Sequence, residues 1–240
     1  MKTQVMQGHV GTSARLQNAA EFRTTGAAGR GCKHYLLLLA VIVLAMVPAF
    51  GGNLTTLYNT GVNDAGAPLN AGVPNGSVDP HYHIVSGPST FYGSFTGGLG
   101  YTTAIASGWW SPPASAEWIN PISNGTGAPS WAPTQGYYDY ETSFDICCTD
   151  PESVVIKGQF AADNNACIWV NGVNTNICTP TNGFSGPTAF QLDAATLAAV
   201  NSAFVPGVNR IDFMVYNSKA SFSNGTPSGL VVVISSATGQ

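Results

Sequence analysis

Charged residues are scarce in this sequence, and basic residues are scarcest in its larger part. Only 8% of the 240 residues are Asp, Glu, Lys or Arg. Three basic and eleven acidic residues follow Gly52, which gives that part a net charge of −8, whereas the part before it carries +4. Nucleic acid and anionic lipid both require a basic partner surface. The acidic part therefore excludes nucleic acid as a partner and excludes adhesion to anionic membranes.

The sequence lacks an apolar run of the about 20 residues that a membrane-spanning helix needs. Its longest run, residues 35–50, has sixteen residues and follows Lys33. A short apolar run behind a basic flank is typical of a signal peptide. We expect residues 1–51 to be a signal peptide with a long n-region, with an uncleaved membrane anchor as the alternative. Residues 52–240 would then be a secreted domain that meets the membrane only during export.

Sequence motifs of common enzyme classes are missing as well. There is no GxSxG elbow, HExxH helix, P-loop or Rossmann glycine pattern. Asp139 and Glu141 share one face of a predicted strand, and a glycoside hydrolase needs two such carboxylates in a cleft. We expect a protein that is not an enzyme, with a glycoside hydrolase as the alternative.

Cysteines are few, and none are spaced as CxxC pairs. Cys147, Cys148, Cys167 and Cys178 follow the predicted signal peptide. An even number in an exported chain favours disulfides. A bond between the adjacent Cys147 and Cys148 would strain the backbone, so we favour the two connectivities that join this pair to Cys167 and Cys178. A metal site is the alternative, which the missing CxxC spacing disfavours.

What the sequence does contain is a series of short strand patterns between Gly, Pro and Asn clusters. Between residues 210 and 216, for example, Ile211, Phe213 and Val215 share one face. Such patterns predict an all-β fold, a jelly-roll β-sandwich of about eight or nine antiparallel strands. The expected strands lie near residues 54–60, 81–86, 101–106, 138–146, 153–162, 166–171, 187–192, 209–217 and 229–236.

Two local signals refine this fold. Asn171 and Gly172 both tolerate a positive φ and predict a tight hairpin turn. Asp193 precedes an alanine-rich segment and predicts a capped short helix over residues 194–200. We expect no other helix after the signal peptide.

Motifs in the second half occur in a characteristic order. Residues 144–146, 163–165 and 170–172 read FDI, DNN and VNG, followed by GVNRIDF at 207–213 and GLVVV at 229–233. This order resembles the galactose-binding-like β-sandwich superfamily. The resemblance implies a jelly roll that serves mainly for binding rather than catalysis.

The first part of the predicted domain adds LYNTGV at residues 57–62, VDPHY at 78–82 and EWI at 117–119. With them the chain resembles a set of uncharacterised exported bacterial proteins, many of which end in a PEP-CTERM sorting signal. The resemblance spans roughly residues 55–236. The Pro-Glu-Pro motif, apolar tail and basic end of that signal do not follow Gly239, so we do not expect sorting by this route.

Aromatic residues provide the best candidates for a sugar-binding surface. Pyranose rings have apolar C–H faces, and flat aromatic rings with polar tips complement them. The alternative is that these side chains anchor long Gly- and Pro-rich loops onto the sandwich. The candidates are Trp109, Trp110, Trp118, Trp131, Tyr137, Tyr138 and Tyr140.

A polar turn is the second candidate. Asp163, Asn164 and Asn165 lie between two predicted core strands, and loops at such places in related sandwiches often bind sugars or a structural calcium. Asp and Asn oxygens suit calcium. The alternative is a turn whose short side chains bond their own backbone.

A histidine pair is the third candidate. His81 and His83 would point to the same face of a strand, as a metal pair requires, and Asp79 lies close to them in sequence. The alternative is a strand start fixed by Pro80, with the histidines packed or solvated.

Together these observations lead to one main hypothesis about function. We expect a secreted, non-enzymatic β-sandwich that binds carbohydrate or extracellular matrix glycans at the bacterial exterior. The alternative is a structural protein of a surface layer or biofilm matrix that needs no small ligand. We expect no cofactor, although a structural calcium remains open.

Overall fold

The computed structural model describes residues 52–54, 56–70, 76–88, 98–121, 131–132, 135–147, 149–218 and 226–240. All of them belong to the compact unit of residues 49–240. The predicted signal peptide, residues 1–51, lies outside the described residues.

Strands are the main secondary structure of the described chain and make up about half of it. One short helix, α2 (Ala194–Ala198), and two 3₁₀ turns, η1 (Pro151–Ser153) and η2 (Gly183–Ser185), complete the described elements. The strands are β1 (Gly52–Asn53), β2 (Val78–Ser86), β3 (Gly98–Thr102), β4 (Ile119–Asn120), β5 (Trp131–Ala132), β6 (Gly136–Ile146), β7 (Val155–Asp163), β8 (Asn165–Val170), β9 (Val173–Cys178), β10 (Thr188–Leu192), β11 (Gly207–Asn217), β12 (Thr226–Pro227) and β13 (Gly229–Gly239).

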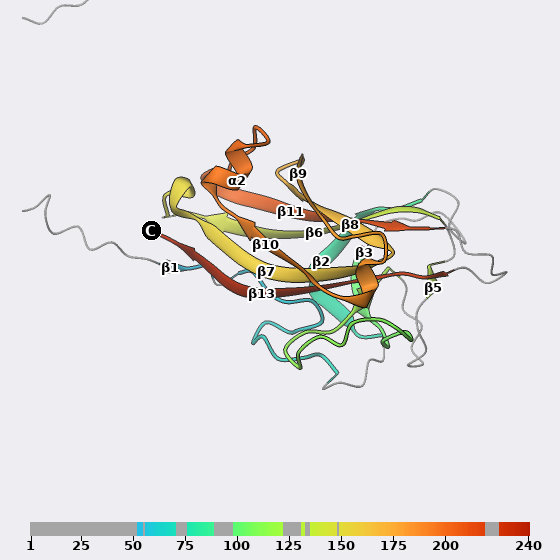
Figure 1. Cartoon of the computed structure of the whole chain (residues 1–240). Coiled ribbons are helices and arrows are strands. Elements are labelled where there is room, and N and C mark those ends of the chain that lie inside the picture. The colour runs from blue at the N-terminus through green and yellow to red at the C-terminus, as the bar shows by residue number, and fades with distance from the viewer. Residues whose placement is uncertain are drawn as a thin grey trace, which may run out of the picture. The chain divides into compact units, whose positions relative to one another are not determined.

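Most strands form one antiparallel sheet that folds over on itself. The order is β10-β7-β13-β4-β3-β2-β6-β11-β8-β9, with β1 paired to β13, while β12 and β5 form a separate pair. In Figure 1, β10, β7 and β13 form a front layer, and β6, β11 and β8 lie behind it. Phe160 of β7 and Phe213 of β11, whose ring centroids are 5.5 Å apart, meet between the two layers. The intervening β4, β3 and β2 join the layers.

The path of the chain between these layers is that of a jelly roll. From β6 onward the strands alternate: β6 in the rear layer, β7 in the front, β8 and β9 in the rear, β10 in the front, β11 in the rear and β13 in the front. The predicted all-β, sandwich-like fold is confirmed.

The core fills the space between the layers with the side chains that the alternation predicts. Ile211, Phe213 and Val215 of β11 are each no more than 1% exposed. The ring of Phe213 packs against Phe160 and, at 6.4 Å, against Phe190 of β10. Each such aromatic side chain buries on the order of 150–250 Å². This cluster therefore holds the two layers together.

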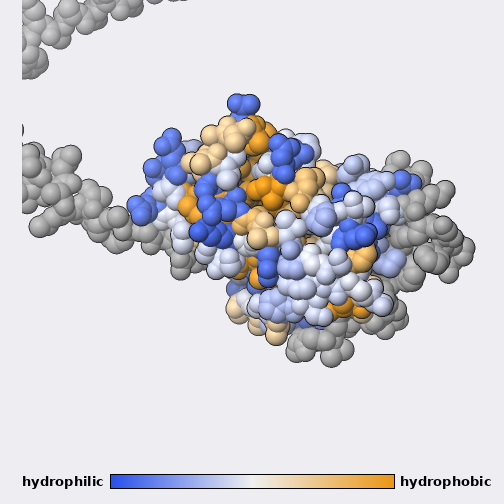
Figure 2. Space-filling model, in the orientation of Figure 1, coloured by the Kyte–Doolittle hydropathy of each residue, from blue (hydrophilic) through white to orange (hydrophobic). Residues whose placement is uncertain are grey.

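The outer surface of the front layer has a different character. Figure 2, in the orientation of Figure 1, shows hydrophobic residues in several separated groups among hydrophilic ones. The exposed large hydrophobic residues in the described chain are likewise scattered, for example Val78, Ile105, Val205 and Val208. Scattered apolar residues are normal on a protein surface and do not mark an interface.

The two local signals are also found in the structure. Asn171 and Gly172 have φ values of 49° and 81° and connect β8 to β9. Asp193 caps α2: its side chain accepts from the Thr196 backbone N–H, and the Thr196 hydroxyl accepts from the Asp193 backbone N–H. Within the described part of the chain, no helix is long and apolar enough to cross a membrane.

Several predicted strand boundaries are wrong. Residues 54–60 are not a strand, although they run beside β13: the Leu54 and Thr60 backbone N–H groups donate to the Ala237 and Val232 carbonyls at 3.0 and 3.1 Å. Between these two bonds the Asn59 side chain replaces a backbone group, accepting from the Ile234 N–H at 2.7 Å. A side chain that takes over a ladder bond breaks the regular pairing that a strand requires.

The favoured disulfide connectivities are wrong as well. Cys167 of β8 is bonded to Cys178 of β9, and the two residues lie directly opposite each other with their Cα atoms 4.1 Å apart. The hairpin register alone would place Cys167 opposite Asn176, and an irregularity in the β8–β9 ladder shifts its partner to Cys178. The sequence spacing did not show this shift. Cys147 is exposed just after β6, and Cys148 lies outside the described residues. Closing the short loop contributes roughly 3 kcal/mol.

Candidate functional site

The loop tryptophans lie mostly beneath their loops. Trp109 and Trp118 are 7% and 1% exposed, and their rings are 4.2 Å apart. They pack with Ala161 of β7 and Val231 of β13. Trp110 is half-buried, and its carbonyl accepts from the Trp118 Nε1–H at 2.9 Å. These rings anchor the loop to the front layer, while the Trp131 side chain lies outside the described atoms.

The candidate tyrosines divide between the two faces of β6. Tyr138 and Tyr140 point into the core and are fully buried, and burial raises the pKa of Tyr138 to about 12. Tyr137 points outward and is 60% exposed. Of these three rings, Tyr137 alone is available to a ligand.

The side chains of the turn from Asp163 to Asn165 form hydrogen bonds with residues that are distant in sequence. The Asp163 carboxylate is 5% exposed and accepts from the Trp109 Nε1–H at 3.1 Å. Burial raises the pKa of Asp163 to about 7, although the Trp109 bond acts in the opposite direction. Asn164 Oδ1 accepts from the Ser218 backbone N–H at 2.6 Å. Protein donors therefore occupy one carboxylate oxygen of Asp163 and the side-chain oxygen of Asn164.

His81 and His83 alternate with the buried Tyr82 and Ile84 and therefore share one face of β2. The His81 ring stacks on Tyr58 with centroids 3.7 Å apart, and His83 is exposed. Asp79 is fully buried, and its two carboxylate oxygens accept from the backbone N–H groups of Gly61 and His81 at 2.7 and 2.8 Å. Asp79 thus positions a loop. Within the described residues, no three His, Cys, Asp or Glu side chains are grouped to hold a metal.

A second polar surface lies on the outer side of the rear layer, where β6 and β11 pair along their full length. Their register runs from Gly136 opposite Asn217 to Ile146 opposite Gly207. Because Tyr138, Tyr140 and Phe213 face the core, the alternate residues face outward. We call this surface the acidic-aromatic face; it comprises Tyr137, Asp139, Glu141, Arg210, Asp212 and Tyr216.

Three carboxylates crowd the middle of the acidic-aromatic face. Glu141 lies directly opposite Asp212, and Asp139 is two residues away on β6. Burial, followed by repulsion from Asp139 and Glu141, raises the pKa of Asp212 to about 6. Burial and the Glu141 charge also raise the pKa of Asp139. Arg210 offsets part of this repulsion through its Nη1, 3.2 Å from Glu141 Oε2.

One oxygen in this group has no hydrogen-bond partner among the described residues. Asp139 Oδ1 is buried and accepts no hydrogen bond from the described residues. An acceptor in this state costs free energy until it is satisfied by a donor.

Aromatic rings flank the carboxylates. Tyr137 and Tyr216 pack with ring centroids 4.9 Å apart at one end of the face. On the neighbouring β8, Asn165 pairs with Tyr216, and Trp169 lies opposite Asp212. Both β8 residues are partly exposed. The face therefore combines flat apolar rings with hydrogen-bond acceptors, and it is shared by three adjacent strands.

Sequence reasoning found part of this face and missed the rest. It selected Tyr137 and Asn165 as ligand candidates and noted Asp139 with Glu141 as paired carboxylates. It missed Asp212, Tyr216 and Trp169. These residues join the face only because β6, β11 and β8 pair with one another, and no local sequence pattern predicts which strands pair. The available signal was the alternation in residues 210–216, which places Arg210, Asp212 and Tyr216 on one face.

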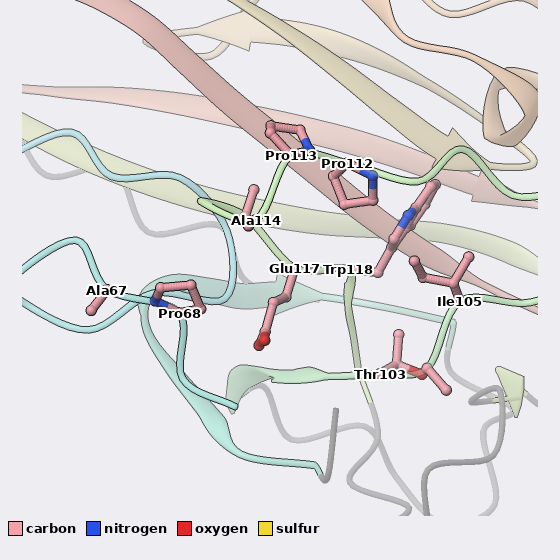
Figure 3. A pocket seen from close by; sticks show the side chains of 11 residues that line it. Ala67, Pro68, Thr103, Ile105, Pro112, Pro113, Ala114, Glu117 and Trp118 are labelled. Carbon is pink, nitrogen blue, oxygen red and sulfur yellow. The ribbon is translucent and has the colours of Figure 1, made fainter. Parts of the chain in front are cut away.

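A pocket of about 670 Å³ lies elsewhere in the described part of the molecule. It lies between the loop after β3 and the proline-rich segment that leads into β4, as Figure 3 shows. Its lining is mostly apolar, with the carboxylate of Glu117 among the side chains. The lining residues are Ala67, Pro68, Thr103, Ala104, Ile105, Pro112, Pro113, Ala114, Ala116, Glu117 and Trp118.

Comparisons with known proteins give no further identification. No protein-family model matches this chain, and no curated protein matches it. The function has to be argued from the geometry of these two surfaces.

Proposed function

We propose that this protein is an exported, non-enzymatic module that binds carbohydrate on the acidic-aromatic face. The observation that carries this proposal is the exposed Tyr137 ring, packed against Tyr216 beside the carboxylates of Asp139, Glu141 and Asp212. The jelly-roll path and the motif resemblance to galactose-binding-like sandwiches also support it, as fold-level analogies.

The physical argument concerns the two kinds of surface that a sugar ring presents. Its C–H face is apolar and is complemented by an exposed aromatic ring such as Tyr137. Its hydroxyl groups donate to carboxylates, and hydrogen bonds to ionised acceptors are stronger than neutral ones. Glu141, whose side chain is 20% exposed, offers an acceptor that a bound hydroxyl can reach.

The arrangement of carboxylates favours binding over hydrolysis. A glycoside hydrolase places the sugar between two carboxylates in a cleft. The pocket contains a single carboxylate, Glu117, while the three carboxylates of the acidic-aromatic face lie on the surface of a sheet. Contacts at one such site correspond to a dissociation constant on the order of 1 mM.

A glycan array followed by isothermal titration tests the proposal on the full chain. We expect binding to at least one neutral polysaccharide, without release of reducing sugar. Replacing Tyr137→Ala should weaken that binding by about tenfold, because it removes the exposed ring. Val205→Ala, which shortens a 44% exposed side chain in the loop before β11, is the control and should leave affinity unchanged.

Four outcomes would contradict the proposal. Absence of binding to every glycan would remove its basis, and equal affinity of the Tyr137→Ala variant would place the site elsewhere. Concentration-dependent assembly of the purified protein without sugar, measured by light scattering, would favour a structural role in a surface layer or matrix. Release of reducing sugar would instead favour a glycoside hydrolase.

A further inference from the structure

We propose that the acidic-aromatic face binds an extended, uncharged oligosaccharide of several sugar units, which lies diagonally across β6, β11 and β8 from Tyr137 to Trp169. The inference rests on the proposed function and deepens it, because it assigns the length, the shape and the charge of the carbohydrate. It follows from the register of the three strands, the side chains along the diagonal and the charges beside it.

Aromatic rings lie at two opposite corners of this part of the sheet. Tyr137 of β6 and Tyr216 of β11 are directly opposite each other. Four residues along β11, Asp212 lies opposite Trp169 of β8. At about 3.4 Å per residue along a strand and about 4.8 Å between strands, the Cα atoms of Tyr137 and Trp169 are about 17 Å apart. One pyranose ring is much shorter than this distance, so a single sugar unit cannot contact both corners.

The side chain in the middle of the diagonal is also apolar. Met214 is half-buried and lies on β11, midway between Asp212 and Tyr216. Because Phe213 and Val215 point into the core, Met214 points to the outer surface. The diagonal therefore passes from aromatic rings over a thioether to another aromatic ring. The apolar C–H faces of successive sugar units complement such a line.

Polar side chains lie at the two remaining corners. Glu141 of β6 is 20% exposed opposite Asp212, and Asn165 of β8 is partly exposed opposite Tyr216. Their side-chain oxygens can accept from sugar hydroxyls, and the Asn165 amide can also donate. A sugar chain on the diagonal would thus have apolar contacts beneath it and hydrogen bonds on both sides.

The aromatic pair at the first corner is ordered without a ligand. The ring centroids of Tyr137 and Tyr216 are 4.9 Å apart, and the Tyr216 hydroxyl accepts from the Gln135 Nε2–H at 2.6 Å. Both rings project from strands that pair over eleven positions. Side chains that are already ordered lose little freedom when a ligand binds, which favours affinity.

The straight path determines the shape of the carbohydrate. The three strands are neighbours in one layer of the sheet, and the contact points lie along one line across them. An extended chain, such as a β-1,4-linked glucan or mannan, presents C–H faces at regular intervals along a straight line. A helical or highly branched glycan turns most of these faces away from a flat surface.

The charge of the face disfavours an acidic carbohydrate. Asp139, Glu141 and Asp212 contribute three carboxylates, and Arg210 contributes one guanidinium. Like charges brought together on binding repel each other, so a uronic acid or a sulfated sugar would bind more weakly. Hydroxyl groups donate to carboxylates without adding charge, which favours an uncharged chain.

An NMR titration of the full chain with sugars of different length and charge tests the inference. The probes are cellobiose and cellohexaose, mannobiose and mannohexaose, and hexagalacturonate as the acidic chain. The titration is run at pH 8, where Asp212, with a pKa of about 6, is ionised.

Length and charge should both change affinity. We expect at least one of the neutral hexasaccharides to bind at least about tenfold more tightly than its disaccharide, because it reaches both corners. It should shift amide signals on β6, β11 and β8. Hexagalacturonate should bind at least about tenfold more weakly than that hexasaccharide.

Two variants and one control locate the second corner. Trp169→Ala removes its ring, so the hexasaccharide should keep an advantage of no more than about threefold over the disaccharide. Trp169→Phe retains a flat ring and should retain most of the advantage. Val208→Ala is the control, because Val208 is 65% exposed on the same side of β11, four residues beyond Asp212 and away from the diagonal.

The outcomes distinguish this inference from the proposed function. A length dependence that Trp169→Ala removes and Val208→Ala leaves intact supports the inference. Equal affinity for disaccharide and hexasaccharide, no effect of Trp169→Ala, equal binding of hexagalacturonate, or no binding of either neutral hexasaccharide overturns it. In each of these cases, binding of another glycan that is lost in Tyr137→Ala would leave the proposed function standing, whereas absence of binding to every glycan would end both. If Trp169→Ala does not fold, the length series and the amide shifts on β8 still decide.

Discussion

The rear layer and the loop region around β4 are held together by different kinds of interaction. In the rear layer, β6 and β11 pair over eleven consecutive positions, and the alternation of their side chains separates core from surface. Around β4, by contrast, the strand has two residues, and single side chains hold the chain: Thr60 bonds Glu117 and Val232, and Asp163 bonds Trp109.

This difference has a consequence for how each region responds to change. A long ladder distributes its stability over many equivalent backbone bonds, and its weak point is the packed interior between the layers. A region held by individual side-chain bonds depends on a few specific atoms, each with a steric or electrostatic requirement. Three predictions test this contrast.

The largest effect is expected in the core between the layers. Phe213→Ala removes the ring that contacts Phe160 and Phe190, and should lower the free energy of unfolding by about 4 kcal/mol through lost burial and a cavity. Urea unfolding at pH 7 measures this. Val208→Ala, at a 65% exposed position of the same strand, is the control and should change stability by less than about 0.5 kcal/mol.

A smaller effect is expected at a single glycine of the loop region. Gly61→Ala places a Cβ atom 2.5 Å from that of Glu117 at a positive φ, and should cost about 3 kcal/mol in the same assay. Gly66 has the same φ of 72° with no atom within 4 Å of its added Cβ. Gly66→Ala should therefore cost about 1 kcal/mol. Equal losses in both variants would contradict the role of the close contact with Glu117.

The smallest effect is the pH dependence that Asp163 introduces. Its pKa is about 7 in the folded protein and about 3.9 when unfolded. Between these values the folded state binds more protons, so the free energy of unfolding falls as pH rises from 4 to 7 and stays low above that window. Asp163 should therefore make the protein more stable at pH 5 than at pH 8, by on the order of 2 kcal/mol.

Asp163→Asn isolates this contribution. The asparagine oxygen can still accept from Trp109 Nε1–H but does not titrate. Its unfolding free energy, measured by urea unfolding between pH 5 and pH 8, should change less with pH than that of the original protein. Asp212, with a pKa of about 6, adds a dependence of the same sign that remains in this variant. Parallel pH profiles for the two proteins would contradict the assignment.

The same contrast explains how much of the structure could be predicted. The alternation in residues 210–216, the Asn171-Gly172 turn and the Asp193 cap each follow from a local pattern, and each is found in the structure. Residues 54–60 were misread as a strand because their place beside β13 depends on the Asn59 side chain, whose partner is 175 positions away. No local pattern carries that information.

The candidate sites also contain some residues that a local sequence pattern predicts and others that depend on distant contacts. Side chains alternate between the two faces of β6. Once the core face was known, this alternation was sufficient to distinguish the exposed Tyr137 from the buried Tyr138. The neighbours that complete the acidic-aromatic face, Asp212 and Trp169, required the strand order. Glu117 was unremarkable in sequence, because its position depends on Gly61 and Asn70, which lie 56 and 47 residues earlier.

The two sides of the folded-over sheet should differ in how readily they unfold locally. The run from β13 through β4, β3 and β2 to β6 links the layers on one side, whereas β9 and β10 terminate the strand order on the other. The Cys167–Cys178 bond fastens β9 to its neighbour, and no described disulfide does so for β10. Local unfolding should therefore start at β10 and reach the linked side last, an order that hydrogen exchange would record as a gradient of protection across the molecule.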